Sequence, residues 1–144
     1  MKKKRLLIVI FIITLGFIWG HSAMGRNASL QESLAVAGWV EVFWGKLFPR
    51  SSVSVNIIRK LAHFFEYSVL GAEMSLISFS GFHGMKFTAV NCLIVAFLDE
   101  TIQIFSGRGP MVSDIWIDLA GGVFGSLIID SLLCLLKRKR THLK

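Results

Sequence analysis

Four long stretches of apolar residues, separated by shorter and more polar segments, dominate the pattern of this chain. They cover residues 6–25, 60–81, 86–105 and 114–136. Each stretch is about 20 residues long, the length of α-helix that crosses the ~30 Å hydrocarbon core of a bilayer. The pattern therefore predicts an all-α integral membrane protein, a bundle of four transmembrane helices that forms a single domain over residues 1–144.

The segment between the first two stretches has a different periodicity. Its start, SLQE at residues 29–32, has the spacing of a capping box, with serine at the helix cap. Apolar side chains then recur at intervals of three and four residues: Leu30, Leu34, Ala37, Val40, Trp44 and Leu47. This pattern predicts an amphipathic helix over about residues 29–48, lying at the outer membrane interface and ended by Pro49. An ordinary helix packed on the bundle is the alternative.

Composition and charge agree with a membrane protein. Of the 144 residues, 53% are hydrophobic and 17% are charged, and the mean hydropathy is +0.63. Basic residues concentrate in two terminal blocks, residues 2–5 and 137–144. Basic blocks that flank apolar spans mark the cytoplasmic side, so we expect both termini in the cytoplasm. No basic stripe with interleaved aromatic residues is present, which argues against a nucleic-acid partner.

Two smaller features complete the membrane interpretation. The first apolar stretch follows a basic tetrad, so a cleaved signal peptide is the alternative to an uncleaved first span. We favour the span, because the small residues that follow it make a poor cleavage site.

Cys92 and Cys134 both fall inside apolar stretches without a metal-binding spacing, and we expect them to be packing residues.

Polar residues within the predicted spans gather at one depth. With both termini in the cytoplasm, the second span descends from the outer surface, the third returns to it and the fourth descends again. At ~1.5 Å of rise per residue, the polar positions of these spans lie within about 10 Å of the outer surface. They are Lys60, His63, Glu66 and Tyr67 in the second span, Asp99, Glu100 and Gln103 in the third, Arg108 in the connecting loop, and Asp114 and Asp118 in the fourth.

Spacing within each helix places these polar groups on shared faces, because residues three or four apart are neighbours on a helix. Such faces cannot look at lipid, so we expect them to face the bundle interior or a wet cleft. Carboxylates outnumber cations, which indicates shared protons, a bound cation or a cationic ligand group. The alternative is a structural lock, in which the polar groups only satisfy one another across helices. Arg108, flanked by glycines, either presents its guanidinium to an anion or pairs with Asp114. Gly121 and Gly125 have the small-xxx-small spacing of close helix contact.

Two motifs resemble the VanZ-like family of bacterial membrane proteins: RKLAHFFEYSVLG at residues 59–71 and DETIQIFSGRGPMVSDIWIDLAGGVFG at residues 99–125. The resemblance covers about the last two thirds of the chain. Gly109 and Pro110 depart from it, since many members have small polar residues after the arginine. The shared positions are Lys60, His63, Phe64, Tyr67, Leu70, Asp99, Glu100, Gln103, Gly107, Arg108, Asp114, Asp118, Gly121 and Gly125.

The resemblance implies a multi-pass protein of the bacterial plasma membrane that acts at the cell envelope. The family takes its name from a protein associated with low-level resistance to the glycopeptide teicoplanin. We therefore expect the outer polar pocket to bind the head group of a lipid or of a lipid-linked peptidoglycan precursor. Lowered susceptibility to teicoplanin-type lipoglycopeptides would follow from such binding.

Two alternative chemistries stay open for the same residues. One is an intramembrane hydrolase or transferase with His63 as general base or nucleophile, oriented by Asp99 or Glu100, and with Arg108 stabilising developing charge. The other is a divalent-cation site formed by Asp99, Glu100, Asp114 and Asp118. Their spacing is not diagnostic of a metal, so no metal or other cofactor is expected. No feature of the sequence indicates the oligomeric state.

Overall fold

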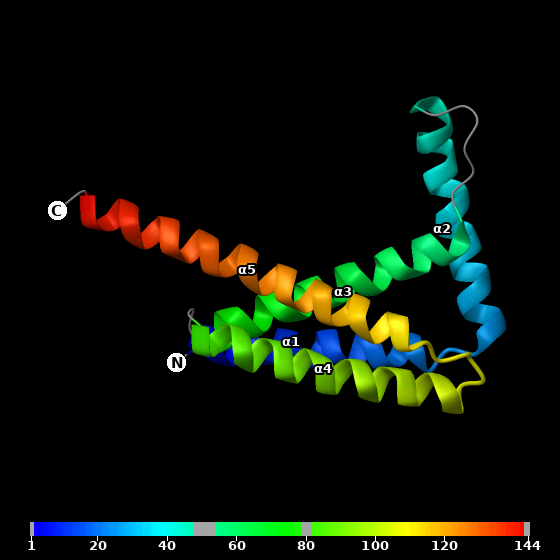
Figure 1. The fold of residues 1–144 in the computed structure, drawn as a ribbon, viewed down its shortest axis with the longest axis horizontal. Helices are drawn as coiled ribbons and strands as arrows, with labels where there is room; N and C mark the ends of the chain where they lie inside the picture. The colour runs from blue at the N-terminus through cyan, green and yellow to red at the C-terminus, as the bar shows by residue number, and fades with distance from the viewer. Residues whose placement is uncertain (1, 48–53, 79–81, 143–144) are drawn as a thin grey trace.

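The computed structural model describes residues 2–47, 54–78 and 82–142, and every regular secondary-structure element within them is an α-helix. The helices are α1 (Lys2–Ser22), α2 (Arg26–Leu47), α3 (Val55–Ser78), α4 (Phe82–Phe105) and α5 (Val112–His142). Helices α1, α3, α4 and α5 run side by side as a bundle, and α2 stands away from it beside the start of α3 (Figure 1). The predicted all-α class is therefore confirmed.

Three of the described helices are long and apolar enough to cross a membrane. They comprise Lys2–Ser22, Gly84–Phe105 and Val112–Lys139, which correspond to the first, third and fourth predicted spans. Helix α3 is not among them, because polar residues such as His63, Glu66 and Glu73 interrupt its apolar sequence. These apolar helices identify the chain as a membrane protein. That α3 also crosses the membrane stays a prediction.

Helix α2 begins earlier than the sequence motif predicted. It starts at Arg26, so Ser29 lies inside the first turn and not at the helix cap. The reason is that the Ser29 amide donates to the Gly25 carbonyl, which extends the helix backwards. Apolar side chains such as Leu34 and Trp39 are exposed on α2, and its interfacial position stays a prediction. Pro49 lies outside the described residues.

Glycines bring α3 and α5 into close backbone contact, the most extensive helix interface of the bundle. A Cβ atom on Gly121 would collide with the carbonyl of Phe64, and one on Gly125 with the carbonyl of Ser68. On the α3 side, a Cβ on Gly71 would strike the α5 backbone. The predicted role of the two α5 glycines in close packing is confirmed, and this interface sets how α3 is rotated against α5.

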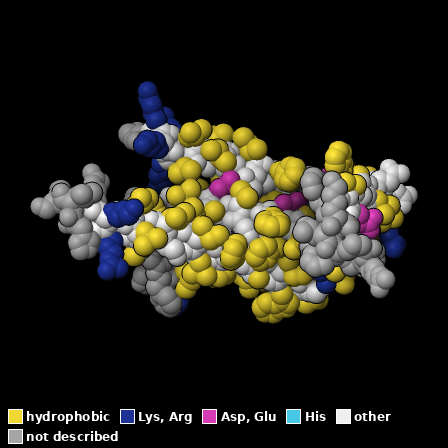
Figure 2. Space-filling view, turned by 90° about the horizontal axis from the view of Figure 1, so that it is seen from above, with side chains coloured by type: hydrophobic (Ala, Val, Ile, Leu, Met, Phe, Trp, Pro, Cys, Tyr) yellow, Lys and Arg dark blue, Asp and Glu magenta, His cyan; other side chains and the backbone are white. Residues whose placement is uncertain are grey.

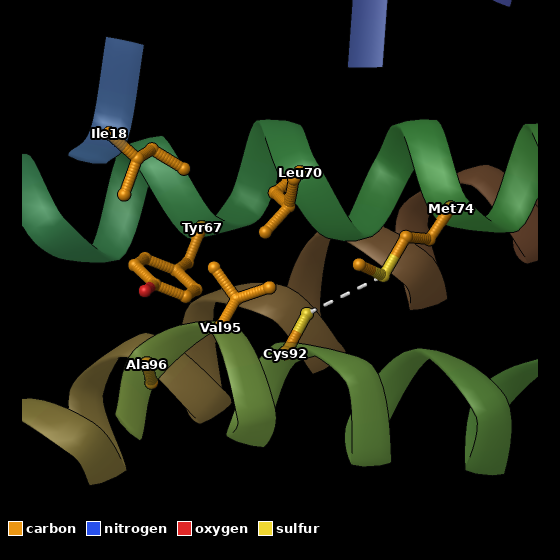
Figure 3. Close-up of a cluster of buried hydrophobic side chains, with 7 residues drawn as sticks. All are labelled: Ile18, Tyr67, Leu70, Met74, Cys92, Val95 and Ala96. Carbon is orange, nitrogen blue, oxygen red and sulfur yellow. Dashed lines mark hydrogen bonds between the residues drawn. The ribbon is translucent and has the colours of Figure 1, made fainter. Parts of the chain in front are cut away.

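A small apolar core lies beneath the polar end of the bundle. It joins Ile18 of α1 to residues from α3 and α4 (Figure 3). Cys92 is fully buried in it with its Sγ 3.9 Å from the Met74 sulfur, which confirms the predicted packing role of this cysteine. Cys134 on α5 is exposed, so the packing role predicted for it is not confirmed. The members of the core are Ile18, Tyr67, Leu70, Met74, Cys92, Val95 and Ala96.

The surface is divided by residue type along the length of the bundle. In Figure 2, apolar side chains cover the middle, and Lys and Arg side chains gather most densely at one end. The first and last described residues of the chain lie at one and the same end of the bundle (Figure 1). An apolar belt with basic residues at one end fits a lipid bilayer.

Candidate functional site

The end of the bundle away from the chain termini holds the buried polar residues. Here α1 and α4 end, α5 begins, and the first turns of α3 lie beside them. Of the nine predicted site residues, only Lys60 is half-buried and the other eight are buried. The buried ones are His63, Tyr67, Asp99, Glu100, Gln103, Arg108, Asp114 and Asp118.

Three helices contribute to the deepest part of the site, which we call the His63 cluster: His63, Asp99 and Asp118. The Nδ1 atom of His63 on α3 lies 3.2 Å from Asp118 Oδ1 on α5 and 4.0 Å from Asp99 Oδ2 on α4. All three side chains are at most 2% exposed. The meeting of these residues follows from their common depth and from the close α3–α5 contact.

Gln103 connects the His63 cluster to the loop between α4 and α5. Its Nε2 donates to Asp99 Oδ2 and to Glu100 Oε1, each at 3.1 Å. The other oxygen of Glu100 accepts a 2.7 Å bond from the Met111 amide. The spacing of Asp99, Glu100 and Gln103 on one helix therefore fixes both carboxylates and holds the loop over the end of α4.

The same loop positions Arg108. Gly107 has a φ of 72°, in the left-handed region that favours glycine, and the Arg108 amide donates to the Gln103 carbonyl at 3.0 Å. The guanidinium turns inward, where its Nη1 donates to the His21 carbonyl at 3.1 Å. Burial, and secondly the charge of Arg59, lowers the pKa of Arg108 below its ordinary value.

Asp114 forms its ion pair with a residue other than the predicted one. Its Oδ2 lies 2.9 Å from Arg59 Nη2, and the proposed pairing with Arg108 is wrong, since Arg108 turns toward α1. The Asp114 side chain is 1% exposed and that of Arg59 is 24% exposed. Arg59 thus neutralises a buried carboxylate at the mouth of the site.

His21 is a site residue that the sequence reasoning missed. Its Nδ1 lies 3.2 Å from Glu66 on α3, and its Nε2 lies 3.2 Å from Glu32 on α2. One imidazole therefore connects three helices. Applying the same depth argument to the first span would have found it, because His21 stands at the outer end of that span.

A cavity of about 340 Å³ opens above these groups, between α2, α3 and the loop that carries Arg108. We call it the arginine pocket. Its polar lining includes Arg26, Ser29, Ser33, Asn56, Arg59 and Arg108, and among the described residues that line it there is no Asp or Glu. Lys60 is not among them either, although it belongs to the predicted site. Arg26 was not predicted, and Arg59 was predicted near the carboxylates but not as a binding residue, since helix rotation decides which cations face a cavity.

These features define a class: a small helical membrane protein with a buried polar centre under a cationic pocket. The VanZ/LLP1 family model matches residues 6–135, and the chain belongs to this family. The resemblance expected from the two sequence motifs is thereby confirmed, and the match extends beyond them into α1 and α2. No curated protein and no solved structure matches the chain.

Proposed function

We propose that the arginine pocket binds the anionic head group of a membrane lipid or of a lipid-linked wall precursor. The observation that carries this proposal is the convergence of Arg26, Arg59 and Arg108 on one cavity whose lining, in the part of the chain that the structure describes, holds no acidic residue. Guanidinium groups suit phosphate and carboxylate because they offer planar, paired donors. Ser29, Ser33 and Asn56 supply neutral polar groups for the rest of a head group.

The proposal includes a topology with four spans and both termini in the cytoplasm. In its support, the two ends of the described chain lie at the same end of the bundle, and basic side chains are concentrated there (Figures 1 and 2). The arginine pocket would then open at the outer surface of a bacterial plasma membrane. Helix α2 would lie at the outer interface and form one wall of the pocket.

A groove between α1 and α3 supports a lipid as the bound molecule over a free anion. It has a volume of about 440 Å³ and is lined mainly by apolar side chains, such as Phe17, Phe65 and Val69. Glu66, at the polar end of the groove, contacts His21, whose backbone carbonyl accepts from Arg108. An apolar chain in this groove could therefore belong to the same molecule as a head group near Arg108.

A lowered susceptibility to teicoplanin would follow from such binding, because teicoplanin acts at the outer surface of the membrane. A protein that holds or shields head groups in the outer leaflet would lower the action of a lipid-tailed glycopeptide at that surface. Vancomycin, which lacks such a tail, would be affected less. This part of the proposal rests on the family resemblance together with the arginine pocket.

An intramembrane hydrolase or transferase is the second candidate function. The observation in its favour is the 3.2 Å approach of His63 Nδ1 to Asp118 Oδ1, since a neighbouring carboxylate can orient a histidine general base. In such an enzyme Asp118, beside Asp99, would take the orienting role that we predicted for Asp99 or Glu100. Turnover of envelope lipids by purified protein, lost in His63→Gln with head-group binding retained, would support the enzyme.

We expect expression of the protein in a sensitive Gram-positive host to raise the minimum inhibitory concentration of teicoplanin more than that of vancomycin. The variant Arg108→Ala should lose the rise, because it removes a cation from the arginine pocket. Arg5→Ala is the matched control, since Arg5 lies in the N-terminal basic block, at the end of the bundle opposite the arginine pocket. The resistance role is refuted if wild-type protein at verified membrane levels leaves both concentrations unchanged.

A further inference from the structure

The His63 cluster contains unusually many polar atoms without hydrogen-bond partners. Within the described residues, both nitrogens of His63, both carboxylate oxygens of Asp118 and Oδ1 of Asp99 are buried and accept or donate no hydrogen bond. The contact of His63 with Asp118 is close, but it lacks hydrogen-bond geometry. Unsatisfied buried polar groups cost about 1–3 kcal/mol each, so a partner that binds these atoms would stabilise the arrangement.

The charges of the cluster point to a cation. Asp99 and Asp118 are both fully buried, and two carboxylates in a membrane bundle repel each other and are costly to desolvate. The nearest arginines are engaged elsewhere: Arg59 pairs with Asp114 and Arg108 binds the His21 carbonyl. A divalent cation with two carboxylates and a neutral imidazole would form an electrically neutral centre.

The geometry fits direct coordination by one atom from each residue. His63, Asp99 and Asp118 each offer a ligand atom, and these atoms lie within 4.8 Å of one another. Two ligands at ~2.1 Å from a tetrahedral ion are about 3.4 Å apart, close to the 3.2 Å between His63 Nδ1 and Asp118 Oδ1. The ligand atoms that lie farthest apart, at up to 4.8 Å, must approach by up to about 1.4 Å, which side-chain rotation supplies.

We propose that His63, Asp99 and Asp118 bind a divalent transition-metal ion such as Zn²⁺ or Mn²⁺ inside the bundle. One imidazole nitrogen with two carboxylates suits these ions, whereas Ca²⁺ takes six to eight oxygen ligands. The ligand set differs from the all-carboxylate set considered from the sequence, because Glu100 binds the Met111 amide and Asp114 pairs with Arg59.

Neighbouring residues complete the site. Gln103 donates to Asp99 Oδ2 and so orients this carboxylate, as residues behind metal ligands commonly do. The Tyr67 hydroxyl is buried without a hydrogen-bond partner in the described part of the chain. Three protein ligands leave a coordination position open, and Tyr67 could bond to a water molecule there. The metal connects α3, α4 and α5 and does not depend on the head-group proposal.

The test measures metal retention by the full chain, purified in detergent with any affinity tag removed. Protein loaded with one equivalent of ZnCl2 and then dialysed should keep about one zinc per chain, measured by mass spectrometry, and should unfold at a higher temperature than unloaded protein. His63→Ala, Asp99→Asn and Asp118→Asn should each weaken zinc binding at least about tenfold. The matched control is Asp130→Asn, because Asp130 lies on α5 and accepts from Ser75 away from the cluster.

Cobalt binding is a second measurement, and it uses only the wild-type protein, so it does not depend on whether the variants fold. Co²⁺ bound to wild-type protein should give the visible absorption of a low-coordinate site, and Zn²⁺ should displace it. Wild-type protein that retains neither ion and shows no shift in unfolding temperature would overturn the proposal. Equal retention by all three folded variants would also overturn it, since the metal would then lie elsewhere. Neither readout involves lipid or antibiotic, so failure here is distinct from failure of head-group binding.

Discussion

Gly125→Val should unfold the bundle at a markedly lower temperature than the wild type. A Cβ at this position would overlap the backbone carbonyl of Ser68, which cannot move without separating α3 from α5. Overpacking costs typically about 1–3 kcal/mol, and we expect the upper end because the obstacle is backbone. The measurement is the unfolding temperature of purified protein in detergent, followed by circular dichroism.

The control for this prediction is Gly20→Val on α1. Gly20 is exposed, and a Cβ there would meet nothing within 4 Å. Both variants add the same side chain to a helix, so propensity effects cancel. If the Gly125→Val and Gly20→Val variants unfold at the same temperature, then α3 and α5 do not make the close backbone contact described above.

Arg59→Met should also destabilise the protein strongly, because it leaves the Asp114 carboxylate buried without its cation. Removing one partner of a buried ion pair costs roughly 3–5 kcal/mol. We expect about 3 kcal/mol, the lower end, since the Arg59 side chain is 24% exposed to solvent. The measurement is the free energy of unfolding in detergent.

A second substitution separates the lost pair from other effects. In Arg59→Met with Asp114→Asn, no orphaned charge remains, so most of the lost stability should return. Arg26→Met is the matched control, because it removes an exposed arginine of the same pocket. An Arg59→Met variant as stable as Arg26→Met would show that Asp114 does not depend on Arg59.

Apolar runs predicted which parts of the chain are helical, but helix ends proved harder. Helix α3 begins at Val55, before the predicted start at residue 60. The charged pair Arg59 and Lys60 interrupts its apolar sequence, and Val55, Asn56 and Arg59 line the arginine pocket. Helix α5 continues to His142, through the basic block that was assigned beyond the fourth span. Hydropathy detects the part of a helix that meets lipid, and it does not detect helical turns that extend into water.

The candidate site was predictable in depth but not in detail. Common depth and helical spacing brought His63, Asp99 and Asp118 together in prediction as in the structure. The ion pair of Asp114 with Arg108 was a wrong prediction. Whether Asp114 meets Arg59 or Arg108 depends on how α3 is rotated about its axis. That rotation is set by backbone contacts at Gly121 and Gly125, which spacing alone does not determine.

The most direct test of the central claim is binding of a phosphorylated lipid to the arginine pocket. Isothermal titration calorimetry with the purified protein should detect binding of farnesyl phosphate but not of farnesol, which has the same apolar chain without the charged phosphate. Arg26→Ala and Arg108→Ala should each weaken binding about tenfold, as expected for loss of one charge-assisted hydrogen bond. Equal binding of farnesyl phosphate and farnesol, or undiminished binding by both variants, would contradict the head-group account.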